Sequence, residues 1–149
     1  ALVRDAVATL ARVREQFPGP LLVAGESLGA GVAAAVAKNS PGALSGLLLI
    51  TPWNSLKQVA HHHYPWVPVD LLLRDRYDNI ANLADFRGPV AVVIAAEDSI
   101  VPAPFGQALF ASLPGAKRLW TIPAADHNDW MMRVDGTWWA TVTGFLLGE

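Results

Sequence analysis

A Gly-x-Ser-x-Gly motif, running from Gly25 to Gly29, is the part of the chain whose residue types and spacing most clearly indicate chemistry. It follows the apolar run from Leu21 to Ala24 and precedes a run of small residues that favours a helix. In this strand–turn–helix context the motif is typical of a nucleophile elbow, a sharp turn that exposes a serine hydroxyl at the end of a strand. We expect both glycines to be needed, because a Cβ atom at either position would collide within the turn. Ser27 is therefore the candidate nucleophile.

A serine hydroxyl is a weak nucleophile until a base accepts its proton and an acid orients that base. One known chain order of such a triad is serine, then aspartate or glutamate, then histidine. A helix that begins directly behind Ser27 would also turn backbone N–H groups and the positive end of its dipole toward a developing oxyanion. The remaining chain can therefore be searched for an acid and a base in that order.

Asp98 is the candidate acid, with Glu97 as the rival carboxylate. Both follow the apolar run from Val90 to Ala95, which predicts a buried strand. In an open parallel sheet, ligands and catalytic groups gather beyond the carboxyl ends of the strands. The alternative role for Asp98 is to cap the helix that follows.

His127 is the candidate base among the 4 histidines of the chain. It comes shortly after a strand-like segment that runs from Arg118 to Pro123, so it too should lie at the carboxyl edge of the sheet. We expect its neighbours Asn128 and Asp129 to cap a helix or to hydrogen-bond within the loop rather than to act as catalysts.

The consecutive histidines His61, His62 and His63 do not predict a metal site. Neighbouring side chains point to opposite faces of a strand and fan around the axis of a helix, so they cannot converge on one ion. The chain has no cysteine, and no nearby carboxylate has convincing ligand spacing. We expect these residues to lie on the surface of a loop or cap.

Taken together, these segments resemble the C-terminal part of an α/β-hydrolase, and the Bem46-like serine hydrolases most of all. The matching segments are Gly-Glu-Ser-Leu-Gly at 25–29, Thr-Pro-Trp-Asn-Ser-Leu at 51–56, Glu-Asp-Ser-Ile-Val-Pro at 97–102 and Asp-His-Asn-Asp at 126–129. Their order across nearly the whole chain is far more specific than any one of them. The loop from Ile100 to Pro102 resembles the one that follows the acid in that family, which favours Asp98 over Glu97.

The resemblance implies roles for individual residues. Ser27 would be the nucleophile, Asp98 the acid and His127 the base, and Leu28 would supply one oxyanion N–H. It implies an ester or thioester of a small-molecule acyl group as substrate, cleaved through an acyl-enzyme, with no metal and no organic cofactor. A peptidase or acyltransferase using the same triad is the alternative within this chemistry.

The family also carries strands ahead of the elbow, and the loop after one of them supplies a second oxyanion N–H. Here a single helical segment precedes the elbow strand. Its apolar positions fall on one face and are Val3, Ala6, Val7, Leu10, Val13 and Phe17. The chain thus resembles a partial α/β-hydrolase fold without the usual N-terminal strands. An interaction or oligomerising module with impaired catalysis is the alternative function.

Without such strands, the run from Leu21 to Ala24 would form an apolar edge of the sheet, and an exposed edge is a template for pairing. We expect a homo-oligomer, or association with another polypeptide, through this edge. Identical strands related by a two-fold axis would have to pair antiparallel.

Composition limits the function classes further. The chain has 149 residues, of which 52% are hydrophobic and 16% charged, with a net charge of −2. A basic surface for nucleic acid is not expected from this balance. No apolar run is long enough to cross a membrane. The cysteine-free composition leaves the compartment open, with a slight preference for the cytoplasm.

Short apolar runs that alternate with helical segments predict an α/β fold, with a mostly parallel sheet and helices on both faces. We expect a single domain over residues 1–149, with residues 52–89 as a cap-like excursion that contains at most short helices, one of them near Val69 to Arg74. Tryptophans cluster in the excursion and after the histidine. Core packing is the favoured role for them, and a wall of the acyl pocket is the functional alternative for Trp53 and Trp130.

Overall fold

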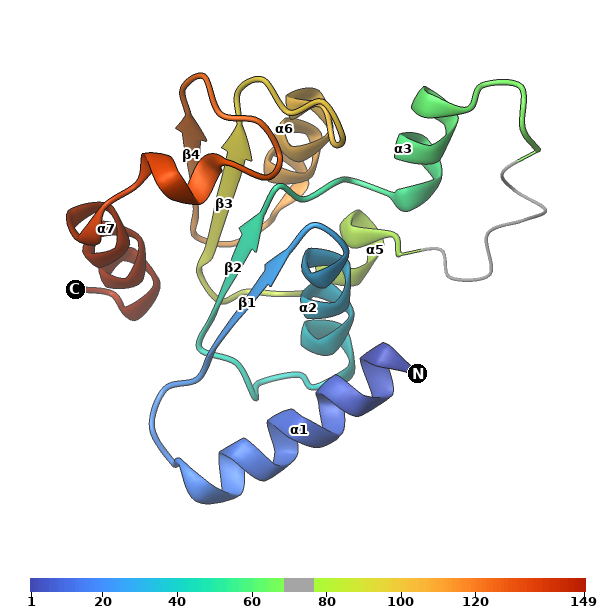
Figure 1. Cartoon of the computed structure of the whole chain (residues 1–149). Coiled ribbons are helices and arrows are strands. Elements are labelled where there is room, and N and C mark those ends of the chain that lie inside the picture. Colours follow the sequence, from blue (N-terminus) through green and yellow to red (C-terminus); the bar gives the residue numbers. More distant parts are fainter. Residues whose placement is uncertain (69–76) are drawn as a thin grey trace.

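The computed structural model describes residues 1–68 and 77–149. At its centre is a parallel sheet whose four strands follow one another in chain order. The strands are β1 (Leu22–Glu26), β2 (Gly46–Ile50), β3 (Val90–Ala95) and β4 (Lys117–Ile122). Their carboxyl ends all point the same way, so that the loops following them meet at one edge (Figure 1).

The two central strands are buried along their whole length. Successive side chains of a strand point to opposite faces, so an unbroken apolar run buries both faces of the sheet. Leu47 and Leu49 pack into one core cluster, whereas Leu48 and Ile50 pack into the other. Burial on both sides explains why these strands read as continuous apolar sequence.

One face of the sheet is covered by α2 (Leu28–Asn39), α5 (Asn79–Leu83) and α6 (Ala103–Ser112). The buried residues of α2 are small ones, mainly alanine, which lets the helix pack closely on the sheet. The opposite face is covered by the short 3₁₀ helix η1 (Trp130–Arg133) and by α7 (Gly136–Leu147). The prediction of a parallel sheet with helices on both faces is confirmed.

The N-terminal helix α1 (Leu2–Gln16) lies against α2 (Figure 1). Ala6, Val7 and Leu10 pack into the core cluster of that face, as their spacing predicts. The expectation that Phe17 shares this apolar face was wrong, because the residue is 60% exposed. The helix ends at Gln16 and the backbone of Phe17 is extended, so Phe17 no longer follows the helical spacing.

The excursion between β2 and β3 is described over residues 52–68 and 77–89. It contains α3 (Leu56–His63), which Ser55 caps by accepting a hydrogen bond from the Gln58 backbone, and α5. An antiparallel backbone bridge between Ser55 and Asp78 joins the residues that precede α3 and α5. Both helices are short, as expected. The helix expected near Val69 to Arg74 lies outside the described residues.

The first strand stands at one end of the described sheet, paired with β2 alone. Beside it, a mostly apolar groove of about 420 Å³ runs between α1 and α2. The groove is lined by Leu2, Ala6, Val23, Ala24, Leu28, Gly29, Val32, Ala33 and Val36. Pairing of this edge with another chain stays a prediction.

Among the helices that the structure describes, none combines the length and the apolar character needed to cross a lipid bilayer.

Candidate active site

Ser27 occupies the turn between β1 and α2 in a strained backbone conformation. Its φ of 51° and ψ of −118° lie in a region that residues with a Cβ rarely adopt. The turn is held by two backbone hydrogen bonds: the Ser27 N–H donates to Ile50 O at 2.9 Å, and Ala30 N donates to Ser27 O at 3.0 Å. The half-buried serine therefore sits at the carboxyl end of β1, directly before the first residue of the helix.

The two glycines of the motif differ in their importance. A Cβ at Gly25 would lie 2.7 Å from the Ala30 nitrogen and closer still to the Gly29 carbonyl. A Cβ at Gly29 would meet nothing within 4 Å. The expectation that both glycines relieve a collision is thus correct for Gly25 and wrong for Gly29, because only Gly25 faces the backbone of the helix that turns back over it.

Asp98 lies in the loop after β3, and its side chain is 1% exposed. Its Oδ1 accepts hydrogen bonds from the backbone of Ile100 at 2.9 Å and of Val101 at 2.6 Å. The turn in the chain after the aspartate therefore serves to fix the carboxylate. The rival Glu97 is exposed, and its backbone N–H donates to Ala125 O.

His127 lies in the loop after β4, with its side chain 7% exposed. Its Nδ1 is 2.8 Å from Oδ2 and 3.0 Å from Oδ1 of Asp98. An ionised carboxylate can only accept, so the imidazole donates from Nδ1. In that tautomer Nε2 carries the lone pair that can receive a proton.

The elbow is joined to the His127 loop by a side-chain hydrogen bond. Trp130 Nε1 donates to Oε1 of Glu26, the residue next to Ser27, at 2.9 Å. The indole is buried, and its ring packs against Trp138 and Trp139. Nothing in the sequence predicts this contact, although both residues lie close in the sequence to candidate catalytic groups.

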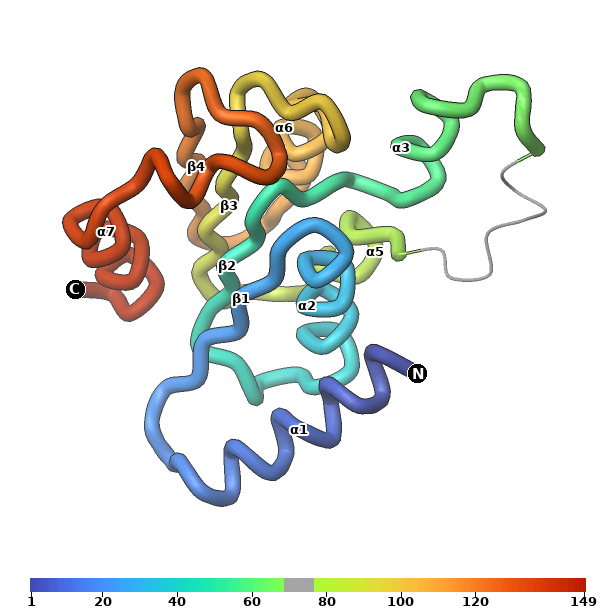
Figure 2. Tube along the Cα trace, viewed as in Figure 1, coloured from blue at the N-terminus to red at the C-terminus, as the bar shows by residue number. Residues whose placement is uncertain are grey.

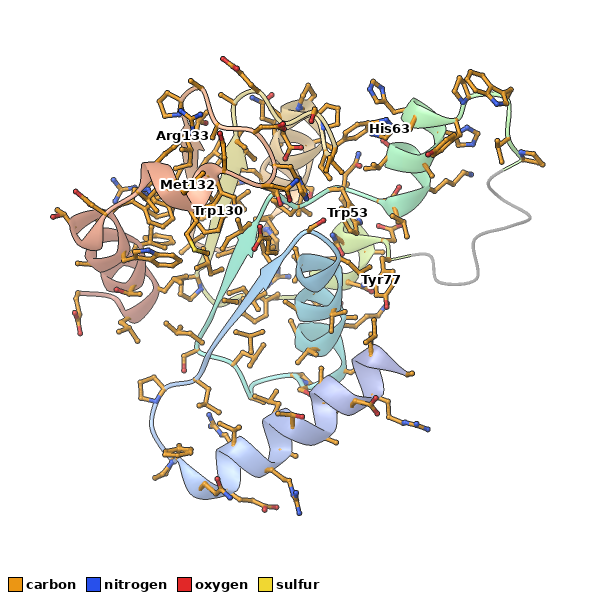
Figure 3. The ribbon with its side chains drawn as sticks, viewed as in Figure 1. Trp53, His63, Tyr77, Trp130, Met132 and Arg133 are labelled. Atoms are coloured by element: carbon orange, nitrogen blue, oxygen red, sulfur yellow. The ribbon has the colours of Figure 1, made fainter. Side chains whose placement is uncertain are left out.

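The three candidate binding residues lie in different surroundings. Leu28 is the first residue of α2, and its side chain is 44% exposed. Trp53 and Trp130 are buried, one in the segment that leads to α3 and the other in η1 (Figure 3). Trp53 packs with Val59 and Val101, so it borders the loop that holds Asp98. A role for the two tryptophans as walls of an acyl pocket stays a prediction.

The loops after β3 and β4 run side by side at the edge of the sheet (Figure 2). A second densely bonded carboxylate in these loops, besides that of Asp98, is Asp126, for which the sequence predicted no role. Its carboxylate accepts from the backbone of Ser99 at 2.8 Å, from the Ser99 hydroxyl at 2.9 and 3.0 Å, and from the backbone of His127 at 2.7 Å. These hydrogen bonds, led by the one from the Ser99 backbone, lower the pKa of Asp126.

Asp129 supports Asp126 from within the same loop. Its Oδ1 accepts from the Asp126 backbone at 2.8 Å, and its carboxylate pairs with Arg133 at 2.7 Å. The Arg133 side chain lowers the pKa of Asp129, and Asp129 in turn raises the pKa of Arg133. The expectation that Asp129 bonds within the loop agrees with this geometry. The signal that could have revealed the network is the clustering of three polar residues around His127.

Thr51, which follows β2, is a second strained residue at this edge of the sheet. Its φ is 44°, an unusual value for a β-branched residue, and it is 2% exposed. Its N–H donates to Val93 O at 2.8 Å, which holds the residue between β1 and β3. Nothing in the sequence marks this position as strained.

The three consecutive histidines form the last turn of α3 and are exposed. His63 Nε2 lies 2.7 Å from the carbonyl oxygen of Ile100, so the excursion is bonded to the loop of Asp98. Within residues 1–68 and 77–149, no group of three or more histidine, cysteine, aspartate or glutamate side chains is arranged to hold a metal ion.

No family model matches the chain. Two uncharacterized proteins, from two strains of Mycobacterium tuberculosis, are each 40% identical to it over 112 residues. The matched region is 75% of this chain and 39% of each relative, so the chain spans about two fifths of the length of these curated relatives.

Among solved structures, the esterase domain of a Rhodothermus marinus protein matches with a TM-score of 0.69 and 24% identity, over 98% of this chain and 66% of that one. A monoacylglycerol lipase from Paleococcus ferrophilus matches with a TM-score of 0.66 and 17% identity, over 99% of this chain and 76% of that one. An α/β-hydrolase enzyme from a deep-sea metagenome matches with a TM-score of 0.70 and 19% identity, over 96% of this chain and 70% of that one.

The chain has the α/β-hydrolase fold. Within this α/β-hydrolase fold, Ser27 follows β1, Asp98 follows β3 and His127 follows β4, in the serine–acid–histidine order typical of the fold. The strained backbone of Ser27 and the hydrogen bond between Asp98 and His127 lie in the loops at this edge of the sheet.

Proposed function

We propose that the chain is a serine hydrolase that cleaves carboxylic ester or thioester bonds. The observation that carries the proposal is the buried Asp98–His127 pair, with Nδ1 to Oδ2 at 2.8 Å, at the same sheet edge as the strained Ser27. The names of an esterase domain and a lipase among the structural neighbours support the choice of an acyl substrate. The matched segments favour the Bem46-like type.

In the proposed mechanism, Nε2 of His127 accepts the hydroxyl proton of Ser27 while Oγ attacks the acyl carbonyl carbon. Asp98 holds the imidazole in the required tautomer and stabilises the imidazolium that forms. The backbone N–H of Leu28, at the start of α2, donates to the oxyanion. His127 then returns the proton to the leaving alcohol or thiol, and a water activated by the same base hydrolyses the acyl-enzyme.

Fluorophosphonate labelling of the purified chain, followed by peptide mapping, tests this proposal. We expect the label on Ser27, no label in Ser27→Ala, and a Ser27→Ala variant with an unchanged circular dichroism spectrum. A folded wild-type chain that takes no label would contradict the proposal and favour a non-catalytic interaction module. A labelled chain that cleaves peptide amides as well as esters in a substrate panel would favour a peptidase instead.

A further inference from the structure

The loops that carry Asp98 and His127 are joined by more than the bond between these two side chains. Near the strands, the backbone of Ala96 donates to Ile122 O at 3.0 Å, and that of Glu97 donates to Ala125 O at 2.8 Å. Besides these backbone bonds and the buried pair, the described hydrogen bonds between the two loops run from Ser99 to the Asp126 carboxylate.

Ser99 is the residue directly after Asp98, and Asp126 is the residue directly before His127. The Ser99–Asp126 contact and the Asp98–His127 contact therefore join the same two loops one residue apart. The backbone bond from Glu97 holds the residue before Asp98, and the Ser99–Asp126 contact holds the residue after it, so Asp98 is fixed on both sides in the sequence. The Asp126 carboxylate also accepts a hydrogen bond from the backbone N–H of His127, which fixes the backbone of His127 as well.

We propose that Asp126 is a positioning residue, which holds the Asp98–His127 pair in its reactive orientation by clamping Ser99 to the His127 loop. The inference rests on the proposed function for its effect on catalysis. Asp126 contacts neither Ser27 nor the His127 ring in the described hydrogen bonds, so it acts through the two residues that it positions. Asp129, held by Arg133, fixes the Asp126 backbone from the other side.

The test compares Asp126→Ala, which removes every bond of the clamp, with Ser99→Ala, which removes the hydroxyl bonds and keeps the backbone bond. We expect the fluorophosphonate labelling rate to fall about 10- to 100-fold in Asp126→Ala, because misplacing a catalytic group by about 1 Å costs on this scale. The decrease in Ser99→Ala should be smaller. Ser99→Thr keeps a hydroxyl and should label at about the wild-type rate. Asp135→Ala is the matched control, because it removes an aspartate that caps α7 through Trp138 N at 2.8 Å and lies in neither loop.

A second readout does not depend on activity. The Nδ1 proton of a histidine bonded to a carboxylate resonates far downfield in proton NMR. We expect this signal in the wild type and in Asp135→Ala, and its broadening or loss in Asp126→Ala at a temperature where that variant is folded. If Asp126→Ala does not fold, the Ser99→Ala and Ser99→Thr pair gives the answer.

An unchanged NMR signal together with a wild-type labelling rate in Asp126→Ala and Ser99→Ala would overturn the inference. If the wild type takes no label, the proposed function fails, and the NMR signal alone then decides whether Asp126 positions the pair.

Discussion

The indole N–H of Trp130 and the carboxylate of Glu26 form a 2.9 Å hydrogen bond between residues 104 positions apart. Glu26 precedes the elbow serine, and Trp130 begins the 3₁₀ turn that follows the His127 loop. The bond therefore joins the end of β1 to the segment that follows β4. Together with the Ser99–Asp126 contact, it leaves the His127 loop bonded to both of the other loops of the candidate site.

Removing the carboxylate should show what this bond contributes to stability. Glu26→Ala leaves the N–H of a buried indole without its acceptor, which costs about 1–3 kcal/mol in the free energy of unfolding. Glu26→Gln keeps an oxygen acceptor and should cost less. Urea unfolding followed by tryptophan fluorescence measures both, with Glu15→Ala on the exposed side of α1 as control. Equal stabilities for Glu26→Ala and Glu26→Gln would show that the bond contributes little.

The two motif glycines offer a matched pair of variants. A Cβ at Gly25 would collide with helix backbone, so Gly25→Ala should destabilise the fold by about 3 kcal/mol or more. Gly29 lies in α2 with open space around it, and Gly29→Ala should be neutral or stabilise by up to about 1 kcal/mol. Thermal unfolding of the two variants checks the difference. A comparable loss of stability in both would mean that the turn is crowded at either position.

Acid should weaken the His127 loop. Hydrogen bonds from Ser99 lower the pKa of Asp126, and the Arg133 side chain lowers that of Asp129, both from an ordinary value of 3.8. A carboxylate with a depressed pKa contributes stability above its unfolded pKa and loses it as the pH falls through its folded pKa. We expect the urea midpoint to drop as the pH falls below 3.8, and to drop less in the double variant Asp126→Asn/Asp129→Asn. Parallel pH profiles for the two proteins would contradict the assignment.

The β1 edge predicts self-association. In the part of the chain that the structure describes, β1 pairs with β2 alone, and its outer flank borders an apolar groove. Sedimentation at increasing concentration should reveal a dimer that Ala24→Lys disrupts, because a charge on an edge strand opposes pairing. Ala8→Lys, at an exposed position of α1, is the control. A wild-type chain that stays monomeric at high concentration would exclude the dimer.

The two central strands could be predicted from the sequence because each is a compact apolar run, and β3 has the predicted bounds. Strand β4 mixes charged and apolar residues, and its bounds differ by one residue from the predicted ones. The order of Ser27, Asp98 and His127 could be predicted for a related reason, because each residue follows a predicted strand. The position of helix α3 was not predicted, because the helix is short and its last three residues are all histidines, which show no apolar periodicity. The polar residues around His127 indicated a hydrogen-bonded loop, but the partner of Asp126 could not be predicted, because Ser99 lies 27 positions away in another loop.

The strained backbone of Ser27 lowers the free energy of unfolding, so the rest of the fold must stabilise it. A residue held at φ 51° and ψ −118° is commonly less stable by about 1–3 kcal/mol than one in an ordinary conformation. Glycine would relieve this strain and would remove the hydroxyl at the same time. If Ser27 is the nucleophile, stability and reactivity oppose one another at a single residue, and selection for thermal stability alone would favour glycine there.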